Sequence, residues 1–135
     1  MILDTSAILA ILFEEPEAQL FATLISQDSK RLLSAATALE IMIVIEARKG
    51  ETGGREFDLL LHRAKIDLVP FDSEQAELAR AAWRQYGKNR HPAGLNFGDC
   101  FAYALAKISG EPLLFKGNDF NQTDIKAVET AELIN

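Results

Sequence analysis

The chain has 135 residues, with 14 Lys and Arg against 20 Asp and Glu, which gives a formal net charge of −6. This length predicts one domain, and 48% hydrophobic with 25% charged residues is typical of a folded globular protein rather than a disordered one. The single cysteine, Cys100, excludes an internal disulfide framework and a cysteine-based zinc site, while the acidic balance argues against nucleic-acid binding through the overall charge.

The N-terminal residues lack the features of a signal peptide. Met1-Ile2-Leu3-Asp4 has no basic region and places an acid within the first apolar run. The longest aliphatic run, 41–45, is far shorter than the roughly 20 residues that cross a membrane. Together with the lone thiol, these features predict a cytoplasmic protein with no membrane association.

Short strand candidates alternate with longer helical stretches along the chain. Strands are expected at 2–3, 31–33, 67–69, 113–115 and 125–128. Helices are expected at 7–13, 16–26, 37–49, 54–65, 73–86 and 97–109, with Gly50, Gly87 and Gly110 at C-terminal stop positions. Strands separated by helices predict a parallel α/β sheet in a single domain that spans residues 1–135.

Residues 41–45 fit two kinds of secondary structure. Their β-branched side chains are consistent with a buried strand by periodicity alone. The residues on either side, 35–39 and 46–50, favour one long helix instead. Because such a helix would be apolar nearly all round, we expect other elements to cover it on both sides.

Three acidic residues follow predicted strands at the carboxyl edge of the sheet, where α/β proteins bind ligands. Asp4 comes directly after the first strand, Glu40 lies in the first turn of the helix after the second strand, and Asp119 follows the fourth strand. We therefore expect these three carboxylates to lie near one another.

A fourth acid, Asp99, is expected at the same edge for a different reason. Helix 97–109 must deliver the chain to the start of strand 113–115, so its N-terminus with Asp99 should face the carboxyl edge. We expect segment 87–96 to cross the domain to reach this point, since ten extended residues span ~33 Å.

Each of these acids also has a purely structural explanation. Helix caps or turns would account for Asp4, Thr37-x-x-Glu40, Asn96-x-x-Asp99 and Asn118-Asp119. Considered jointly, four acids at one edge would repel one another and raise their pKa values unless a cation lay among them. With no histidine at these positions, an all-oxygen site suits Mg²⁺ or Mn²⁺, and hydrolysis of a phosphodiester is the chemistry that such cations support.

Several sequence strings carry a family resemblance. Residues 2–7 (ILDTSA), 95–100 (LNFGDC) and 113–120 (LLFKGNDF), together with Glu40, closely resemble the PIN-domain ribonucleases, and most closely the VapC toxins of bacterial VapBC toxin–antitoxin pairs. The resemblance covers essentially the whole chain. It implies a three-layer α/β/α PIN-like domain with a short-stranded parallel sheet, RNA cleavage that depends on Mg²⁺ or Mn²⁺, frequent homodimerisation, and inhibition by a cognate VapB-type antitoxin.

The resemblance also implies roles for individual residues. The catalytic and metal-binding acids map onto Asp4, Glu40, Asp99 and Asp119. Supporting roles, in orienting ligands or binding through water, are expected for Thr5, Ser6 and Asn118.

Contact with RNA must be local, because the chain as a whole is acidic. Lys88, Arg90 and Lys116 are predicted to meet phosphates near the acidic edge. Arg80 and Arg84, four residues apart, are also explained as the solvated face of a helix. One bound divalent cation would change the net charge from −6 to −4 and two would change it to −2, so the acidic balance does not exclude RNA.

Two other functions remain open from the residues alone. An aspartyl phosphatase-like enzyme also places an aspartate after its first strand, but it usually has a second acid two residues later, where this chain has Ser6. A regulatory module would bind Mg²⁺ in the acidic pocket and cleave nothing. The phosphatase-like enzyme would hydrolyse phosphate esters without cleaving RNA. The regulatory module would bind the metal without any metal-dependent nuclease activity.

Overall fold

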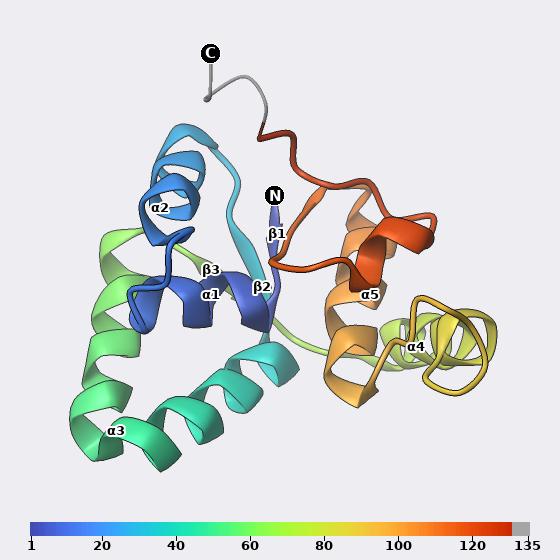
Figure 1. Ribbon diagram of the computed structural model, residues 1–135, viewed down its shortest axis with the longest axis horizontal. Coiled ribbons are helices and arrows are strands. Elements are labelled where there is room, and N and C mark those ends of the chain that lie inside the picture. Colours follow the sequence, from blue (N-terminus) through green and yellow to red (C-terminus); the bar gives the residue numbers. More distant parts are fainter. Residues whose placement is uncertain (131–135) are drawn as a thin grey trace.

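The computed structural model describes residues 1–130 as four short parallel strands between two groups of helices (Figure 1). The domain predicted from sequence extends to residue 135, and residues 131–135 lie outside the described part. The strands are β1 (Ile2–Leu3), β2 (Leu32–Ser34), β3 (Asp67–Val69) and β4 (Leu113–Leu114). Their spatial order is β3-β2-β1-β4 and every pairing is parallel, which confirms the predicted parallel α/β fold.

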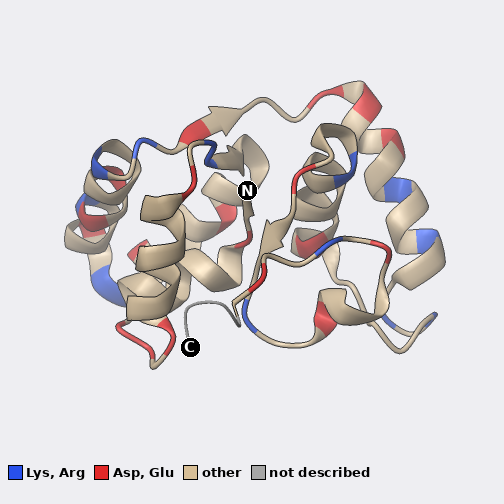
Figure 2. Ribbon diagram, turned by 90° about the horizontal axis from the view of Figure 1, so that it is seen from above, with Lys and Arg blue, Asp and Glu red and all other residues tan. Residues whose placement is uncertain are grey.

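Two helical layers enclose the sheet. The helices are α1 (Thr5–Leu12), α2 (Ala18–Gln27), α3 (Ala35–Arg63), α4 (Ser73–Tyr86) and α5 (Phe97–Ser109), followed by a short 3₁₀ helix, η1 (Asp119–Gln122). α1, α2 and α3 lie on one side of the strands, and α4 and α5 lie on the other (Figures 1 and 2). This arrangement is the predicted three-layer architecture.

The sheet divides the hydrophobic core into two clusters. Successive side chains of a strand point to opposite faces, so Leu3 packs with the α1–α3 layer and Ile2 packs with the α4–α5 layer. Phe57 of α3 and Leu105 of α5 are buried on these two sides. Within residues 1–130, no helix is both long and apolar enough to cross a membrane.

The region 35–63, α3, consists of two helical segments that meet at a kink, as the sequence predicted. Gly50, predicted as a helix stop, has φ 63° and ψ −157° inside α3, a conformation that glycine adopts without the penalty of a side chain. Residues 41–45 are helical, which settles their ambiguity. The expectation that both sides of this helix are covered is wrong, because Leu39 and Ile43 are 57% and 61% exposed.

Two other expectations about the chain path are also wrong. Residues 125–128 do not form a fifth strand, because Ala127 makes one isolated bridge to Leu113 beside a β4 that has only two residues. Segment 87–96 does not cross the domain. It turns back on itself, with Gly87 bridged to Leu95 and the Leu95 N–H donating to the carbonyl of Tyr86 at 2.9 Å.

The orientation of α4 explains why no crossing is needed. Figure 1 views α4 nearly end-on while α5 runs in the plane of the view, and the bridge from Gly87 to Leu95 holds the end of α4 two residues from the start of α5. The two helices pack closely against each other, and Ala82 and Tyr86 of α4 share a core cluster with Tyr103 of α5. A compact turn is therefore sufficient to join them.

Candidate active site

The four acids predicted at the sheet edge line a single cavity of about 300 Å³. Asp4 follows β1, Glu40 lies in the second turn of α3, Asp99 lies in the first turn of α5, and Asp119 begins η1. The supporting residues Thr5 and Ser6, together with Asn96 and Lys116, line the same cavity. The structure thus brings side chains from four separate segments to one place.

Asp4 is buried and also caps α1. Its Oδ2 accepts hydrogen bonds from the backbone N–H of Ser6 at 3.1 Å and from the Ser6 hydroxyl at 2.6 Å. Burial raises the pKa of the Asp4 carboxyl, although the bonds from Ser6 act in the opposite direction. Asp4 therefore caps α1 and lines the cavity at the same time.

Glu40 is held by a hydroxyl and approached by a glycine. The Thr5 hydroxyl donates to Glu40 Oε1. A Cβ atom at Gly98 would lie 2.1 Å from Glu40 Oε2, so a side chain at position 98 would displace the carboxylate. Gly98 was not identified as a site residue from sequence, and its place inside the LNFGDC string was the available signal. The Thr37 cap considered for this helix is wrong, because Ser34 caps α3.

Asp99 lies in a capping box at the start of α5. The Asn96 N–H donates to Asp99 Oδ2 at 3.0 Å, and the Asp99 N–H donates to Asn96 Oδ1 at 2.9 Å. The pKa of Asp99 is raised to about 7, chiefly by burial and also by the charges of the other three acids, while the hydrogen bond with Asn96 acts to lower it. Asp99 therefore lies within electrostatic range of the other three carboxylates.

Asp119 and its neighbour Asn118 differ in position. Asp119 is an exposed residue at the cavity wall, just after Gly117, whose φ of 99° turns the chain away from β4. The side chain of Asn118 accepts a hydrogen bond from Asn121 Nδ2 at 3.0 Å and is not part of the cavity lining. The structure does not bring Asn118 to the other predicted residues.

The three basic residues predicted to meet RNA lie in different environments. The Lys116 ammonium lines the cavity but pairs with Glu15 at 3.0 Å and with Glu17 at 3.3 Å, so its positive charge is compensated. Lys88 is exposed in the turn after α4. The Arg90 guanidinium lies over the ring of Trp83, 4.0 Å from its centroid, outside the acidic cavity.

The donor set of the cavity suits a hard divalent cation. Carboxylate oxygens are the ligands that Mg²⁺ and Mn²⁺ prefer, and no histidine lines the cavity. Within residues 1–130, the hydrogen bonds engage one oxygen each of Glu40 and Asp99 and leave the other oxygen without a protein donor. Within the same residues, no three His, Cys, Asp or Glu side chains already lie close enough together to form a ready-made metal cluster.

Known proteins resemble the chain in both sequence and fold. The PIN domain model matches residues 1–126. Ribonuclease VapC30 of Mycobacterium tuberculosis is 60% identical over 128 residues, which covers 95% of this chain and 98% of the relative.

Two solved structures show the same fold at low sequence identity. Mycobacterium tuberculosis VapC20, described as a toxin that cleaves the sarcin–ricin loop, has a TM-score of 0.75 at 15% identity over 94% of this chain and 97% of that one. The VapBC-1 structure from nontypeable Haemophilus influenzae has a TM-score of 0.75 at 18% identity over 96% and 97%.

Proposed function

The chain belongs to the PIN-domain family and to its VapC ribonucleases, and from this premise we propose that its four-carboxylate cavity hydrolyses RNA phosphodiester bonds with Mg²⁺ or Mn²⁺. The protein is an endoribonuclease of the kind that serves as the toxin of a type II toxin–antitoxin pair. The observation that carries the proposal for the site is the meeting of Asp4, Glu40, Asp99 and Asp119 around one cavity.

The cation would be held by Asp4 and Asp99 with Glu40, Asp119 or both. A divalent cation in such a site lowers the pKa of a water molecule and stabilises the negative charge that develops on the leaving oxygen. The four acids cannot supply this stabilisation themselves, since their own charges repel both phosphate and one another.

The residues around the acids hold the carboxylates in place. Ser6 fixes Oδ2 of Asp4, Thr5 fixes Oε1 of Glu40, and the N–H of Asn96 fixes Oδ2 of Asp99. Partners that orient the ligands of a metal in this way reduce the reorganisation that binding and catalysis require. Thr5 and Ser6 therefore act as positioning residues in this proposal.

The protonation of Asp99 should make metal binding in the cavity depend on pH. With a pKa of about 7, Asp99 is about half protonated near neutral pH in the absence of metal. A divalent cation favours the ionised carboxylate, so metal binding releases a proton from this group. Metal affinity should accordingly increase with pH across the range in which Asp99 ionises.

A VapB-type antitoxin is the partner that family membership favours, and the similar structure from Haemophilus influenzae carries the name VapBC-1. Homodimerisation is a second prediction from the resemblance. Co-purification of the chain with the antitoxin encoded beside it, followed by sedimentation, tests both interactions separately.

The experiment that tests the function is incubation of the purified protein with cellular RNA, with Mn²⁺ or with EDTA, followed by mapping of the cut sites. We expect discrete cuts that require the metal. Metal binding without any cleavage would instead support the regulatory module, and hydrolysis of small phosphate esters without RNA cleavage would support the phosphatase-like enzyme.

A further inference from the structure

Segment 78–98 is locally basic in an acidic protein. It comprises the second half of α4, the turn after it and the start of α5, and it contains Arg80, Arg84, Lys88 and Arg90 with no Asp or Glu. All four basic side chains are exposed. Figure 2 shows acidic residues at one end of α4, the helix on the right, and basic residues towards the other.

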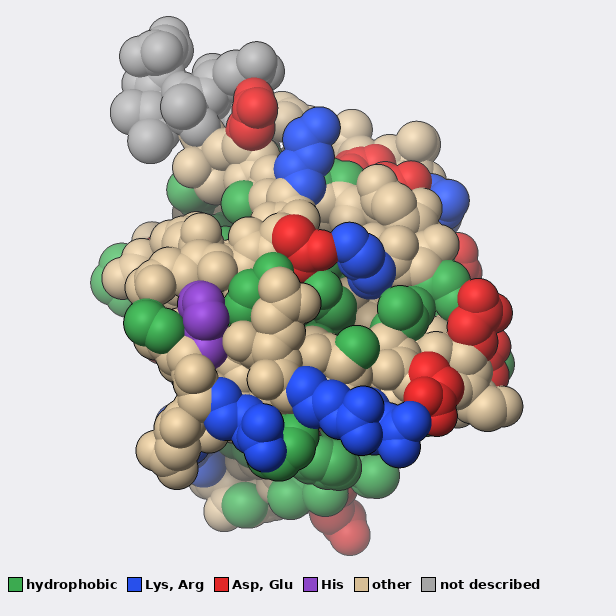
Figure 3. All heavy atoms as spheres, turned by 90° about the vertical axis from the view of Figure 1, so that its right-hand side faces the viewer, with side chains coloured by type: hydrophobic (Ala, Val, Ile, Leu, Met, Phe, Trp, Pro, Cys, Tyr) green, Lys and Arg blue, Asp and Glu red, His purple; other side chains and the backbone are tan. Residues whose placement is uncertain are grey.

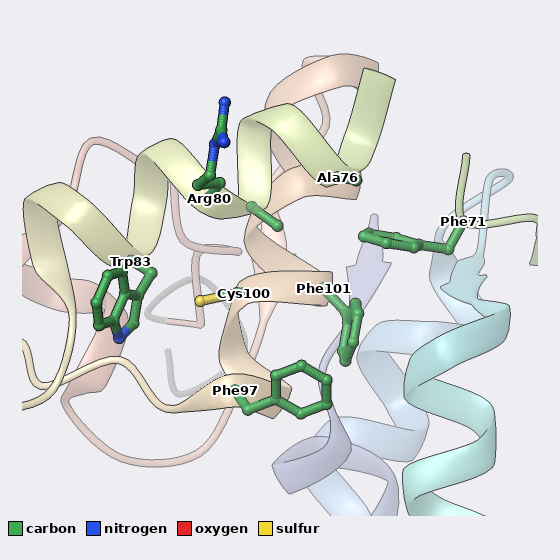
Figure 4. Close-up of a pocket in the computed structure, with 8 residues that line it drawn as sticks. Phe71, Ala76, Arg80, Trp83, Phe97, Cys100 and Phe101 are labelled. Carbon is green, nitrogen blue, oxygen red and sulfur yellow. The ribbon is translucent and has the colours of Figure 1, made fainter. Parts of the chain in front are cut away.

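An aromatic hollow lies beside this basic segment. Its volume is about 520 Å³, which is within the range of roughly 300–1,000 Å³ found for ligand sites. Figure 4 shows Trp83 and Arg80 of α4 on one side and the rings of Phe97, Phe101 and Phe71 on the other. On the outer face of α4, basic side chains gather next to hydrophobic ones (Figure 3).

The rings of the hollow are both ordered and accessible. Phe97 meets Phe101 edge to face with centroids 4.8 Å apart, and Phe101 meets Phe71 in the same manner at 4.8 Å. Phe97 is nevertheless 79% exposed, and Trp83, with Arg90 over its ring, is 43% exposed. Exposed rings and a planar cation are the groups on which proteins stack unpaired bases.

A second apolar hollow, which shares lining residues with both, lies between the aromatic hollow and the acidic cavity. Phe97 and Phe101 also line this second hollow of about 410 Å³, which they share with Glu40 and Val44. Glu40 and Val44 in turn line the acidic cavity. A chain bound along these three hollows would therefore have its backbone at the carboxylates and neighbouring groups against the rings.

We propose that Phe97, Trp83 and Arg90 form a stacking platform for unpaired bases that flank the cleaved phosphate. The proposal rests on the ribonuclease function above and specifies its substrate as a single-stranded or looped RNA segment, because the bases of a duplex are already stacked and paired. Arg90, whose guanidinium lies over the Trp83 ring, also supplies positive charge to the platform.

The charge of the platform favours RNA over a second copy of the chain. A two-fold interface through segment 78–98 would bring two sets of Arg84, Lys88 and Arg90 together, whereas Arg80 is already paired with Glu77 at 2.9 Å. An RNA strand has the opposite charge and carries the flat apolar groups that match the rings. Charge complementarity therefore selects the nucleic acid as the occupant.

Trp83 allows a direct test, because it is the single tryptophan of the chain. We would titrate the Asp4→Asn variant, in Mg²⁺, with a short mixed-sequence RNA, with its duplex, and with an abasic strand of the same length. The single strand is expected to quench Trp83 fluorescence strongly, while the duplex and the abasic strand quench it weakly.

Variants of the platform add a second readout. Phe97→Ala in the same background is expected to raise the Kd for the single strand at least about fivefold, as loss of one stacked base predicts. Phe97→Leu, which keeps apolar volume but not the ring, should behave similarly. Leu59→Ala removes an exposed apolar side chain of α3 far along the chain and should leave the Kd unchanged. Arg90→Ala should lower the slope of log K against log salt by about 0.7.

Three results would overturn the platform. They are unchanged Trp83 fluorescence on addition of the single strand, a Kd of both Phe97 variants equal to that of the parent Asp4→Asn protein, and a fluorescence change that follows protein concentration without RNA, which would assign the hollow to a second copy. Cleavage of cellular RNA by the wild-type protein is scored separately. Cleavage without a Trp83 response rejects the platform alone, whereas absence of metal-dependent cleavage rejects the proposed function.

Discussion

The acidic cavity and the aromatic platform meet at the first turn of α5 but are built in opposite ways. Asp99 lies in the cavity and Phe97, two residues earlier, lies on the platform. In the cavity, hydrogen bonds hold Asp4, Glu40 and Asp99, and burial raises the pKa of Asp4 and Asp99. On the platform, apolar rings are exposed next to Arg90, which makes no ion pair with the residues that the structure describes.

This difference assigns RNA cleavage to the cavity and RNA binding to the platform. A cavity of four carboxylates has no affinity for phosphate until a cation binds, whereas the platform attracts and stacks a strand without one. Loss of a cavity acid should therefore abolish cleavage and spare binding, and loss of a platform residue should weaken binding and spare the chemical step. The following variants test this division.

The largest effect is expected for Asp99→Asn. Because the variant removes a charged oxygen from the proposed cation site but keeps the capping geometry, cleavage should fall at least about 100-fold while the variant stays folded. Asp58→Asn, at an exposed position of α3, is the matched control and should cleave normally. Undiminished cleavage by Asp99→Asn would remove this residue from the site.

Gly98→Ala should have the next largest effect. Its Cβ would overlap the Glu40 carboxylate, which can move because it is the end of a flexible side chain. We expect cleavage to fall about tenfold, as for other groups that position metal ligands, with little change in thermal stability. Comparison of cleavage rates and melting curves measures both. A large loss of stability with normal specific activity would show that Gly98 serves packing alone.

The pH dependence of stability should report on the cavity before any metal binds. Asp99 keeps its proton to about pH 7 in the folded chain but loses it near the ordinary value of 3.8 when unfolded, and burial raises the pKa of Asp4 too. The folded state thus binds more protons in this interval, so stability decreases as pH rises from about 4 to 7. Thermal melts in EDTA should show the decrease, and Asp99→Asn should reduce it. A stability that increased over this interval would contradict the assignment.

The smallest effect is expected for Lys116→Ala. Since Glu15 and Glu17 compensate its charge, its loss should change the Kd for single-stranded RNA less than about twofold, the usual scale of exposed ion pairs. Arg90→Ala, on the platform, should weaken binding more and reduce its salt dependence. If Lys116→Ala had the greater effect, attraction for RNA would belong to the cavity and the division of roles would fail.

The elements that carry the acids could be predicted from sequence to within a few residues, because short apolar runs, caps and glycine stops are local signals. Helices 73–86 and 97–109 and strand 67–69 have their predicted bounds. Whether residues 125–128 form a fifth strand could not be predicted from their own sequence, since pairing depends on the length of the neighbouring strand β4. The path of 87–96 was wrong for a related reason, because sequence does not tell how α4 lies against α5.

That the four acids meet in one cavity could also be predicted, from their positions after strands and from the motif strings. Their hydrogen-bond partners were only partly accessible. Thr5 and Ser6 line the cavity, whereas the side chain of Asn118 accepts a hydrogen bond from Asn121 in its own turn. Gly98 depends on Glu40 of another helix, and the exposure of Phe97 depends on packing between α3 and α5, so neither could be deduced from neighbours in the chain.

The central claim is that the carboxylate cavity binds the divalent cation that RNA cleavage requires. The most direct measurement is Mn²⁺ binding followed by the loss of the electron paramagnetic resonance signal of free Mn²⁺, for the wild-type protein and the Asp4→Asn/Asp99→Asn double variant at the same concentration. We predict that the wild-type protein removes the signal and that the folded double variant leaves it. Equal Mn²⁺ binding by the two proteins would contradict the assignment of the cavity.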